Sequence, residues 1–120
     1  MTRAMCSRWF WCAALGALLL SASAGCRQGA AARGESDGQA LYSELCARCH
    51  GAGGQPTGSM VARHGVKDLT SPEVQAEMTD DQLRSQILDG SDNRQMPAFQ
   101  GAISDAQVEA VIEHVRTLSQ

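Results

Sequence analysis

Two cysteines and a histidine stand together in the segment Cys46-Ala47-Arg48-Cys49-His50. Cysteines three residues apart project from one side of a helical turn, where each thiol can add across a vinyl group of haem to form a thioether. The histidine that follows then lies over the centre of the porphyrin and can bind the iron as its proximal ligand. The segment therefore predicts one covalently bound haem c, held by Cys46, Cys49 and His50.

Met96, followed by Pro97, is the predicted distal ligand of the iron. A thioether is a soft ligand that favours ferrous iron and raises the reduction potential. Pro97 lacks an amide donor and stiffens the segment that presents the sulfur. Met60, Met78 and His64 remain rivals for this position, and an open distal site is a further alternative.

Two other interpretations of the cysteine pair need features that the sequence does not supply. A structural zinc site requires four ligands, and the other candidates, Cys26, His64 and His114, follow no known zinc spacing. A redox-active CxxC is typical of chains with a strand-helix-strand pattern, whereas no convincing period of two appears in this sequence. Haem attachment is therefore the favoured interpretation.

The elements that must position these residues are predicted to be helical. Apolar residues one turn apart and two capping boxes, which begin at Thr79 and Ser104, mark the helices. Helices are predicted over 38–46, 71–76, 80–89 and 105–118. The glycine-rich segment 51–65 and the segment 91–101 are predicted loops. The expected fold class is all-α, a bundle of about four short helices around the haem.

The first 25 residues have the composition of a signal peptide. Arg3 and Arg8 form a positive region, an apolar stretch follows, and small residues precede a cleavage site. The apolar stretch is too short to span a bilayer as a stable helix, although a retained anchor is an alternative. Residues 26–37 are expected to form a flexible linker and 38–120 the folded domain. The protein is therefore expected to be exported to the periplasm.

Cys26 is a candidate site of lipid attachment. Ala24-Gly25-Cys26 is similar to the end of a bacterial lipoprotein box, with Ser23 where that pattern prefers leucine. A lipid tether would explain an odd cysteine in an oxidising compartment. Ordinary cleavage after Ala24 is the alternative, so both a membrane-anchored lipoprotein and a soluble periplasmic protein are expected forms.

The net charge limits which partners are expected, and the low aromatic content limits how the core can be filled. Without the first 25 residues, 8 basic residues stand against 13 acidic ones, a net charge of −5. This excess argues against nucleic acid as a partner, and it suits a basic docking patch on another protein or only keeps the domain soluble. Tyr42 and Phe99 are the only aromatic side chains left, so a large apolar cofactor is expected to fill the interior.

The segment from Gly38 to Leu118 resembles a class I cytochrome c of the small bacterial kind. The resemblance rests on Gly38-Gln39-Ala40-Leu41-Tyr42, on Cys46 to Gly51, on Asp68-Leu69, on Met96-Pro97-Ala98-Phe99 and on Val115-Arg116-Thr117-Leu118. It implies that the first and last helices cross at Gly38 and Tyr42. It also implies that His50 and Met96 are the two axial ligands of the iron.

Two positions depart from the family pattern. The last helix carries His114 where an aromatic side chain is usual at the crossing. Val66 and Lys67 stand where members often have proline, close to the carbonyl that accepts the ring N–H of the proximal histidine. A ligating histidine is expected to have such an acceptor, but the sequence does not indicate which carbonyl supplies it.

The resemblance implies an electron carrier, either a shuttle or a tethered relay in a respiratory chain, and not an enzyme in itself. A monomer with redox proteins as donor and acceptor is expected, and the domain could serve as a subunit of an oxidoreductase complex. The alternative is a haem protein with an open iron site, a sensor of small ligands or an enzyme subunit, in which Met96 binds weakly or not at all.

Overall fold

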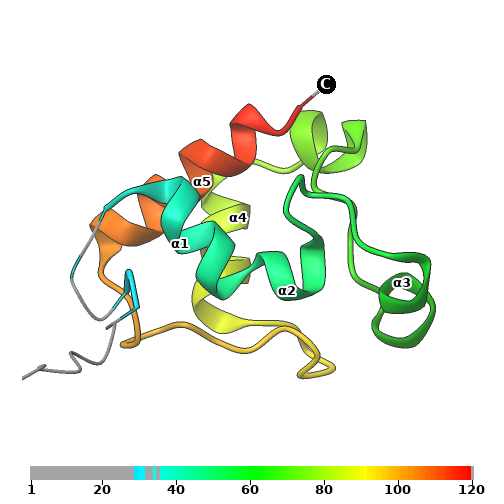
Figure 1. The fold of residues 1–120 in the computed structure, drawn as a ribbon, viewed down its shortest axis with the longest axis horizontal. Helices are drawn as coiled ribbons and strands as arrows, with labels where there is room; N and C mark the ends of the chain where they lie inside the picture. Colours follow the sequence, from blue (N-terminus) through cyan, green and yellow to red (C-terminus); the bar gives the residue numbers. More distant parts are fainter. Residues whose placement is uncertain (1–28, 32–33, 35, 120) are drawn as a thin grey trace, which may run out of the picture.

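The computed structural model describes residues 29–31, 34 and 36–119. In these residues the chain forms five α-helices and a short π-helix, and one isolated bridge pairs Gln100 with Ile103. The elements are α1 (Gly38–Leu45), α2 (Ala47–His50), α3 (Gly58–His64), η1 (Glu73–Glu77), α4 (Asp80–Asp89) and α5 (Asp105–Thr117) (Figure 1). The predicted all-α class is confirmed. The predicted signal peptide and Cys26 lie outside the described residues.

Helices α1 and α5 cross in close contact, with Gly38 at the crossing (Figure 1). A Cβ atom on Gly38 would lie 1.9 Å from the carbonyl oxygen of Ala110 and 3.1 Å from Cβ of His114, so only glycine fits there. One turn later, the ring of Tyr42 packs on the imidazole of His114, with centroids 5.0 Å apart and planes inclined by 52°. His114 therefore takes the aromatic position at the crossing.

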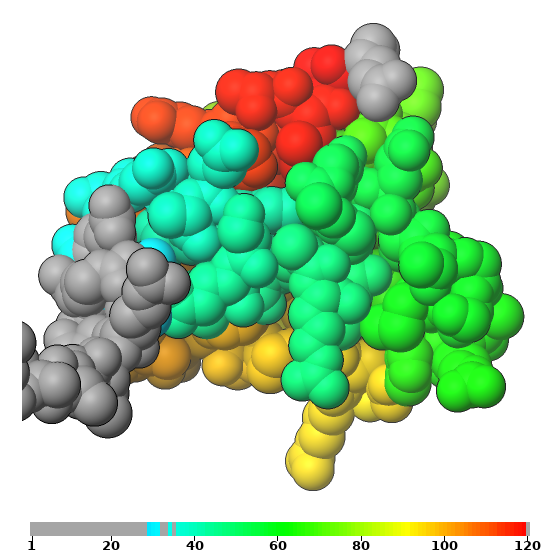
Figure 2. Space-filling model, in the orientation of Figure 1, coloured from blue at the N-terminus to red at the C-terminus, as the bar shows by residue number. Residues whose placement is uncertain are grey.

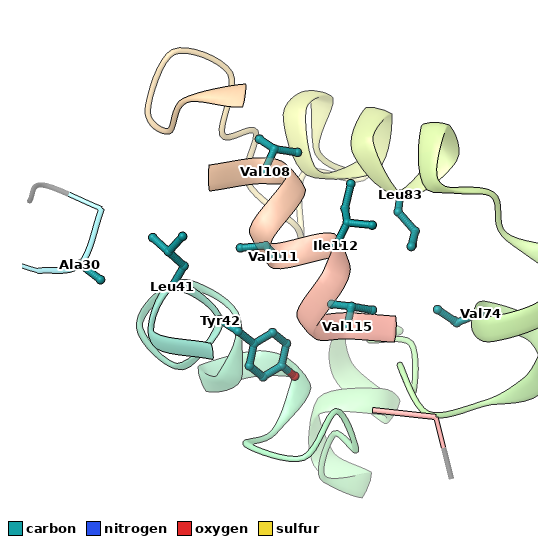
Figure 3. Close-up of a cluster of buried hydrophobic side chains, with 9 residues drawn as sticks. All are labelled: Ala30, Leu41, Tyr42, Val74, Leu83, Val108, Val111, Ile112 and Val115. Carbon is teal, nitrogen blue, oxygen red and sulfur yellow. The ribbon is translucent and has the colours of Figure 1, made fainter. Parts of the chain in front are cut away.

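The hydrophobic core lies between α1, α4, α5 and η1 (Figure 3). Helix α5 contributes one face with the spacing i, i+3, i+4 and i+7, as its sequence pattern predicts. The buried hydrophobic residues of the helices are Leu41, Tyr42, Val74, Leu83, Val108, Val111, Ile112 and Val115. The core is small, and three of its α5 residues, Val111, Ile112 and Val115, also line a cavity.

The two longest helices begin where capping boxes predict them. The Thr79 hydroxyl accepts from the backbone N–H of Gln82, whose side chain accepts from the backbone N–H of Thr79. Ser104 and Gln107 make the same exchange at the start of α5. Each exchange satisfies two backbone donors that a helix start otherwise leaves unpaired.

Three short elements differ from the prediction. Helix α3 lies inside the segment 51–65 that was expected to be a loop, begun by Thr57 and ended by Gly65 in the left-handed conformation. None of its residues is buried, so it has no apolar period by which the sequence could reveal it. The first helix is interrupted at Cys46, which separates α1 from α2. The helix expected over 71–76 is instead the π-helical turn η1.

Arg116 ties the end of α5 to the segment between η1 and α4. Its Nη1 donates to the carbonyl oxygens of Val74 and Gln75 at 3.2 and 3.0 Å, and its Nη2 donates to that of Met78 at 2.7 Å. Its Nε donates to Oδ1 of Asp80 at 2.9 Å. One guanidinium thereby satisfies carbonyl groups that a π-helix end would leave without donors.

We expect Arg116→Met, which keeps an aliphatic stem but has no donors, to lower the free energy of unfolding by about 2 kcal/mol, because it leaves partly buried carbonyls unpaired. Denaturant unfolding of the purified protein measures this. Arg84→Met is the matched control: Arg84 pairs with Glu109 at a partly exposed site, and such pairs contribute about 1 kcal/mol or less. Equal losses in the two variants would contradict the role given to Arg116.

Residues ahead of α1 contact the domain. Ala30 is buried, and its N–H donates to the carboxylate of Glu44 on α1. The side-chain amide of Gln107 on α5 donates to the carbonyl oxygen of Ala31 at 3.4 Å. The flexible linker over 26–37 stays a prediction, because half of that segment lies outside the described residues. Among the helices that the structure describes, none has the length and apolar character of a transmembrane span.

Candidate functional site

A mainly apolar cavity lies beside the core, between α2, α4, α5 and the loop that follows α4. It is lined by Tyr42, Leu45, Cys46, Cys49, His50, His64, Gly65, Val66, Lys67, Leu69, Val74, Met78, Leu83, Gln86, Ile87, Ser91, Asn93, Gln95, Met96, Pro97, Phe99, Val111, Ile112 and Val115. All four residues predicted to hold the cofactor are among them. Figure 2 shows the segments of α2, α3 and the loop after α4 adjoining on one face of the molecule.

Cys46 and Cys49 enter the cavity from the junction of α1 and α2. Cys46 ends α1 and begins α2, and the N–H groups of Cys49 and His50 both donate to its carbonyl oxygen, which fixes the turn that carries the pair. Both cysteines are half-buried and neither is in a disulfide. Burial raises the pKa of the Cys46 thiol to about 11, and the neighbouring Cys49 adds to the shift.

We expect the Cys46 thiol of the folded chain without cofactor to react slowly with iodoacetamide at pH 8. The thiolate is the reactive form, and a pKa of about 11 leaves only on the order of one thiol in a thousand ionised. A Cys49→Ala variant removes the neighbouring thiol, and mass spectrometry of the peptide that contains Cys46 follows its labelling apart from that of Cys26. The same variant in denaturant is the control, and we expect it to react at least about tenfold faster. Equal rates in the two states would contradict the protection.

His50 ends α2 with its imidazole held in one orientation. Its Nδ1 lies 3.1 Å from the carbonyl oxygen of Lys67, and because a carbonyl only accepts, Nδ1 carries the proton and Nε2 keeps its lone pair. Burial lowers the pKa of His50, against the opposing effect of the Lys67 carbonyl, and so favours the neutral ring. The acceptor that the sequence left unassigned is therefore Lys67.

Met96 is presented by a loop that closes on itself. The Ser91 N–H donates to the carbonyl oxygen of Met96 at 3.1 Å, and the Met96 N–H donates to Oγ of Ser91 at 2.9 Å. Between them, the Arg94 N–H donates to the Ser91 carbonyl, and Arg94 takes the left-handed conformation with φ of 58°. These bonds fix the backbone of Met96 without any contact from its side chain.

The segment after Met96 is bonded to the end of α4. The N–H groups of Phe99 and Gln100 donate to the carbonyl oxygens of Ile87 and Leu88, both at 3.1 Å. Gly90, with φ of 76°, lets this segment pass close, because a Cβ there would lie 2.6 Å from the Met96 carbonyl oxygen. The position of Met96 therefore depends on α4, and Gly90 does more than end that helix.

The alternative candidates for the distal ligand differ in whether they line the cavity. Met78 lines the cavity, and Met60 does not. His64 also lines the cavity, and its Nδ1 is hydrogen-bonded to Oε1 of Gln95, the residue before Met96. This bond joins the end of α3 to the methionine loop and engages one ring nitrogen of His64.

The donor set of this cavity fits a haem. Two thiols on one turn, an imidazole with its Nε2 left unprotonated and a thioether on a separate loop all line one apolar space. A porphyrin needs such a lining, because it is large, flat and mostly apolar. Among the residues that the structure describes, no cluster of three His, Cys, Asp or Glu residues has the arrangement of a metal site.

Comparisons with known proteins agree with this donor set. Residues 33–115 match the family model described as "Cytochrome C oxidase, cbb3-type, subunit III". A "Dihydro-heme d1 dehydrogenase" from Pseudomonas aeruginosa is 33% identical over 82 residues, which are 68% of this chain and 15% of that protein. This chain thus spans about a seventh of the length of that relative.

Solved structures show the same fold. The "KustC0563 c-type cytochrome" is 30% identical and superposes with a TM-score of 0.64 over 70% of this chain and 99% of its own. A single-residue mutant of the same protein is 29% identical, with a TM-score of 0.61 over 69% of this chain and 99% of its own.

Proposed function

The chain belongs to the cytochrome c family of cbb3-type oxidase subunit III domains, and from this membership we propose that it is a single-haem electron carrier or tethered relay with His50 and Met96 as axial ligands. The family is that of class I c-type cytochromes, which bind haem c covalently and transfer electrons. The haem supplies an iron that alternates between the ferric and ferrous states. The single CxxCH segment of the sequence supports one haem.

The observation that carries the proposal is that Cys46, Cys49, His50 and Met96 line one cavity. Cys46 and Cys49 are the residues that would form the thioethers. His50 presents its Nε2 because Lys67 holds the other ring nitrogen, which also makes the imidazole a better donor. His50 comes from α2 and Met96 from the loop after α4, and these two residues would hold the two axial positions of the iron.

The surrounding side chains limit what the site does. Apolar residues from α4 and α5 line part of the cavity, and a methionine ligand in such surroundings would raise the reduction potential. Two protein ligands on the iron would leave no place for a substrate, so we infer that the domain is not itself a catalyst. Because the similar dehydrogenase is much longer than this chain, a place in a larger oxidoreductase complex is also compatible with this role.

The proposed place of action is the periplasm. Export is proposed from the composition of the first 25 residues, and membrane attachment from Cys26 as a lipid-bearing residue. Mass spectrometry of the mature N-terminus tests both. A diacylated Cys26 would establish the lipoprotein, and an unmodified terminus near residue 25 would establish the soluble form.

The function is tested on protein exported from a host with a working cytochrome c maturation system. We expect the haem to resist acid-acetone extraction, and the pyridine haemochrome to show one haem per chain. The reduced protein is expected to have the sharp α-band of low-spin iron and to bind no carbon monoxide at neutral pH. Colourless protein would refute the cofactor, and rapid carbon monoxide binding would favour the open iron site instead.

A further inference from the structure

The methionine loop, residues 91–96, is closed by its own hydrogen bonds. Besides the exchange between Ser91 and Met96, the Ser91 hydroxyl donates to Oδ1 of Asn93 at 2.7 Å. The backbone N–H of Gln95 donates to the same oxygen at 3.1 Å. All of these bonds lie within the loop, so they fix its shape but not its position relative to the segments across the cavity.

One side-chain hydrogen bond leaves the methionine loop. Nδ1 of His64 is bonded to Oε1 of Gln95, and because an amide oxygen only accepts, the imidazole is the donor. Among the residues with a described placement, this is the only hydrogen bond between the loop and another segment, and no ion pair joins them. The position of the loop relative to α3 therefore depends on His64.

Helix α3 stands apart from the other helices (Figure 1). None of its residues is buried, so it adds nothing to the hydrophobic core. His64 is its last residue, and it is the residue of α3 that lines the cavity. The contribution of α3 that the structure shows is therefore to carry His64 to the edge of the cavity.

The segment that His64 begins also supports the proximal histidine. Three residues after His64, the carbonyl oxygen of Lys67 accepts from Nδ1 of His50 at 3.1 Å. Segment 64–67 is thus bonded directly to one predicted iron ligand, and to the other, Met96, through the residue that precedes it. This short segment connects the support of His50 with the loop that carries Met96.

We propose that His64 is a positioning residue for the distal ligand, because its bond to Gln95 keeps the methionine loop against the cavity. This role rests on the proposed ligation of iron by His50 and Met96. A thioether favours ferrous iron, so its bond to ferric iron is the one that opens more readily. Opening that must also break the bond between His64 and Gln95 has a smaller equilibrium population.

Imidazole, added to the oxidised holoprotein at pH 8, measures how readily the distal position opens. It binds the iron only where the thioether has left, the iron stays ferric, and the loss of the far-red band gives an apparent dissociation constant. We expect His64→Leu and Gln95→Leu each to lower this constant about threefold or more, the effect of one lost hydrogen bond. The double variant is expected to add little to either, because both changes remove the same bond.

Two further variants separate the hydrogen bond from other effects of the substitutions. His64→Asn places an amide N–H where Nδ1 stands, and we expect it to keep the dissociation constant within about 1.5-fold of the wild type. Gln55→Leu is the matched control, because Gln55 is also an exposed glutamine that bonds a distant segment, through Nε2 to Oγ1 of Thr70 at 3.5 Å. That bond does not involve the methionine loop, and we expect the constant to be unchanged.

The outcomes separate the role of His64 from the proposed function. Equal constants in the wild type and the two leucine variants would overturn the positioning role and leave the electron-carrier function intact. Failure of His64→Asn to recover the wild-type constant, or an equal effect of Gln55→Leu, would overturn it as well. Oxidised wild-type protein without the far-red band would instead contradict ligation by Met96, and with it the function as proposed.

Discussion

Met96→Ala is expected to lower the reduction potential by on the order of 0.1 V or more, within the ~0.8 V range that axial ligation spans. Removal of the thioether takes away the ligand that favours ferrous iron. The oxidised variant is expected to lose the weak far-red band of sulfur-to-iron charge transfer, and the reduced variant to bind carbon monoxide. Potentiometric titration with optical spectra measures all three. The hydrogen bonds that hold the loop use the backbone of Met96, so the fold is expected to survive.

Two other methionines are the controls for this experiment. Met78→Ala removes a thioether that also lines the cavity, and Met60→Ala removes one that does not. Both are expected to keep the far-red band, and Met78→Ala is expected to change the potential only slightly. A band that persists in Met96→Ala and vanishes in Met78→Ala would assign the ligand to Met78. Loss of the band in a His64 variant as well as in Met96→Ala would point to an effect of His64 through Gln95.

Gly38→Val is expected to lower the free energy of unfolding by about 3 kcal/mol, the upper part of the range for overpacked cores. The Cβ of the valine would lie 1.9 Å from the backbone oxygen of Ala110. A backbone atom cannot move away by a rotamer change, as the end of a flexible side chain can. Helices α1 and α5 must therefore separate, and the packing of Tyr42 on His114 is lost with them. For a domain of this size the melting temperature is expected to fall by about 10 °C or more.

Gly58→Ala is the control for the glycine substitution. Gly58 lies at the start of α3, and a Cβ there would have nothing within 4 Å. Alanine at that position is expected to leave stability unchanged or to raise it slightly, since it reduces the entropy of the unfolded chain. A fall as large as that of Gly38→Val would show that loss of glycine by itself, and not the helix crossing, is responsible. Calorimetry of the holoproteins decides between these results.

The sequence predicted the elements that depend on local patterns. Thr79 and Ser104 begin helices because their hydroxyls accept hydrogen bonds from the backbone N–H groups three residues later. Such capping residues can be recognised from the sequence alone. The apolar spacing of α5 follows from the single face that it buries. The chemistry of Cys46, Cys49 and His50 was equally local, since all three lie within one turn.

Apart from the crossing of α1 and α5, which the family resemblance implied, contacts between distant segments could not be predicted from the sequence. The Lys67 carbonyl that holds His50 is a backbone group, and every residue has one, so no residue type distinguishes the acceptor. The bonds between Ser91 and Met96 and the bond between His64 and Gln95 require knowledge of how the loops fold back. Helix α3 was missed because it buries no residue and therefore carries no periodicity. The choice of Met96 over Met60 and Met78 rested on its place before Pro97, and it stays a prediction.

The half-buried Cys46 has a consequence for the biogenesis of the protein. In the finished fold a raised pKa leaves few of these thiols ionised, yet thioether formation needs the thiol to be reactive. The thioether at Cys46 is therefore expected to form more readily while the chain is still loosely structured. A mutation that speeds folding of the haem-free chain would then lower the yield of haem-containing protein. The folding rate of the chain would set how quickly the maturation machinery must attach the haem.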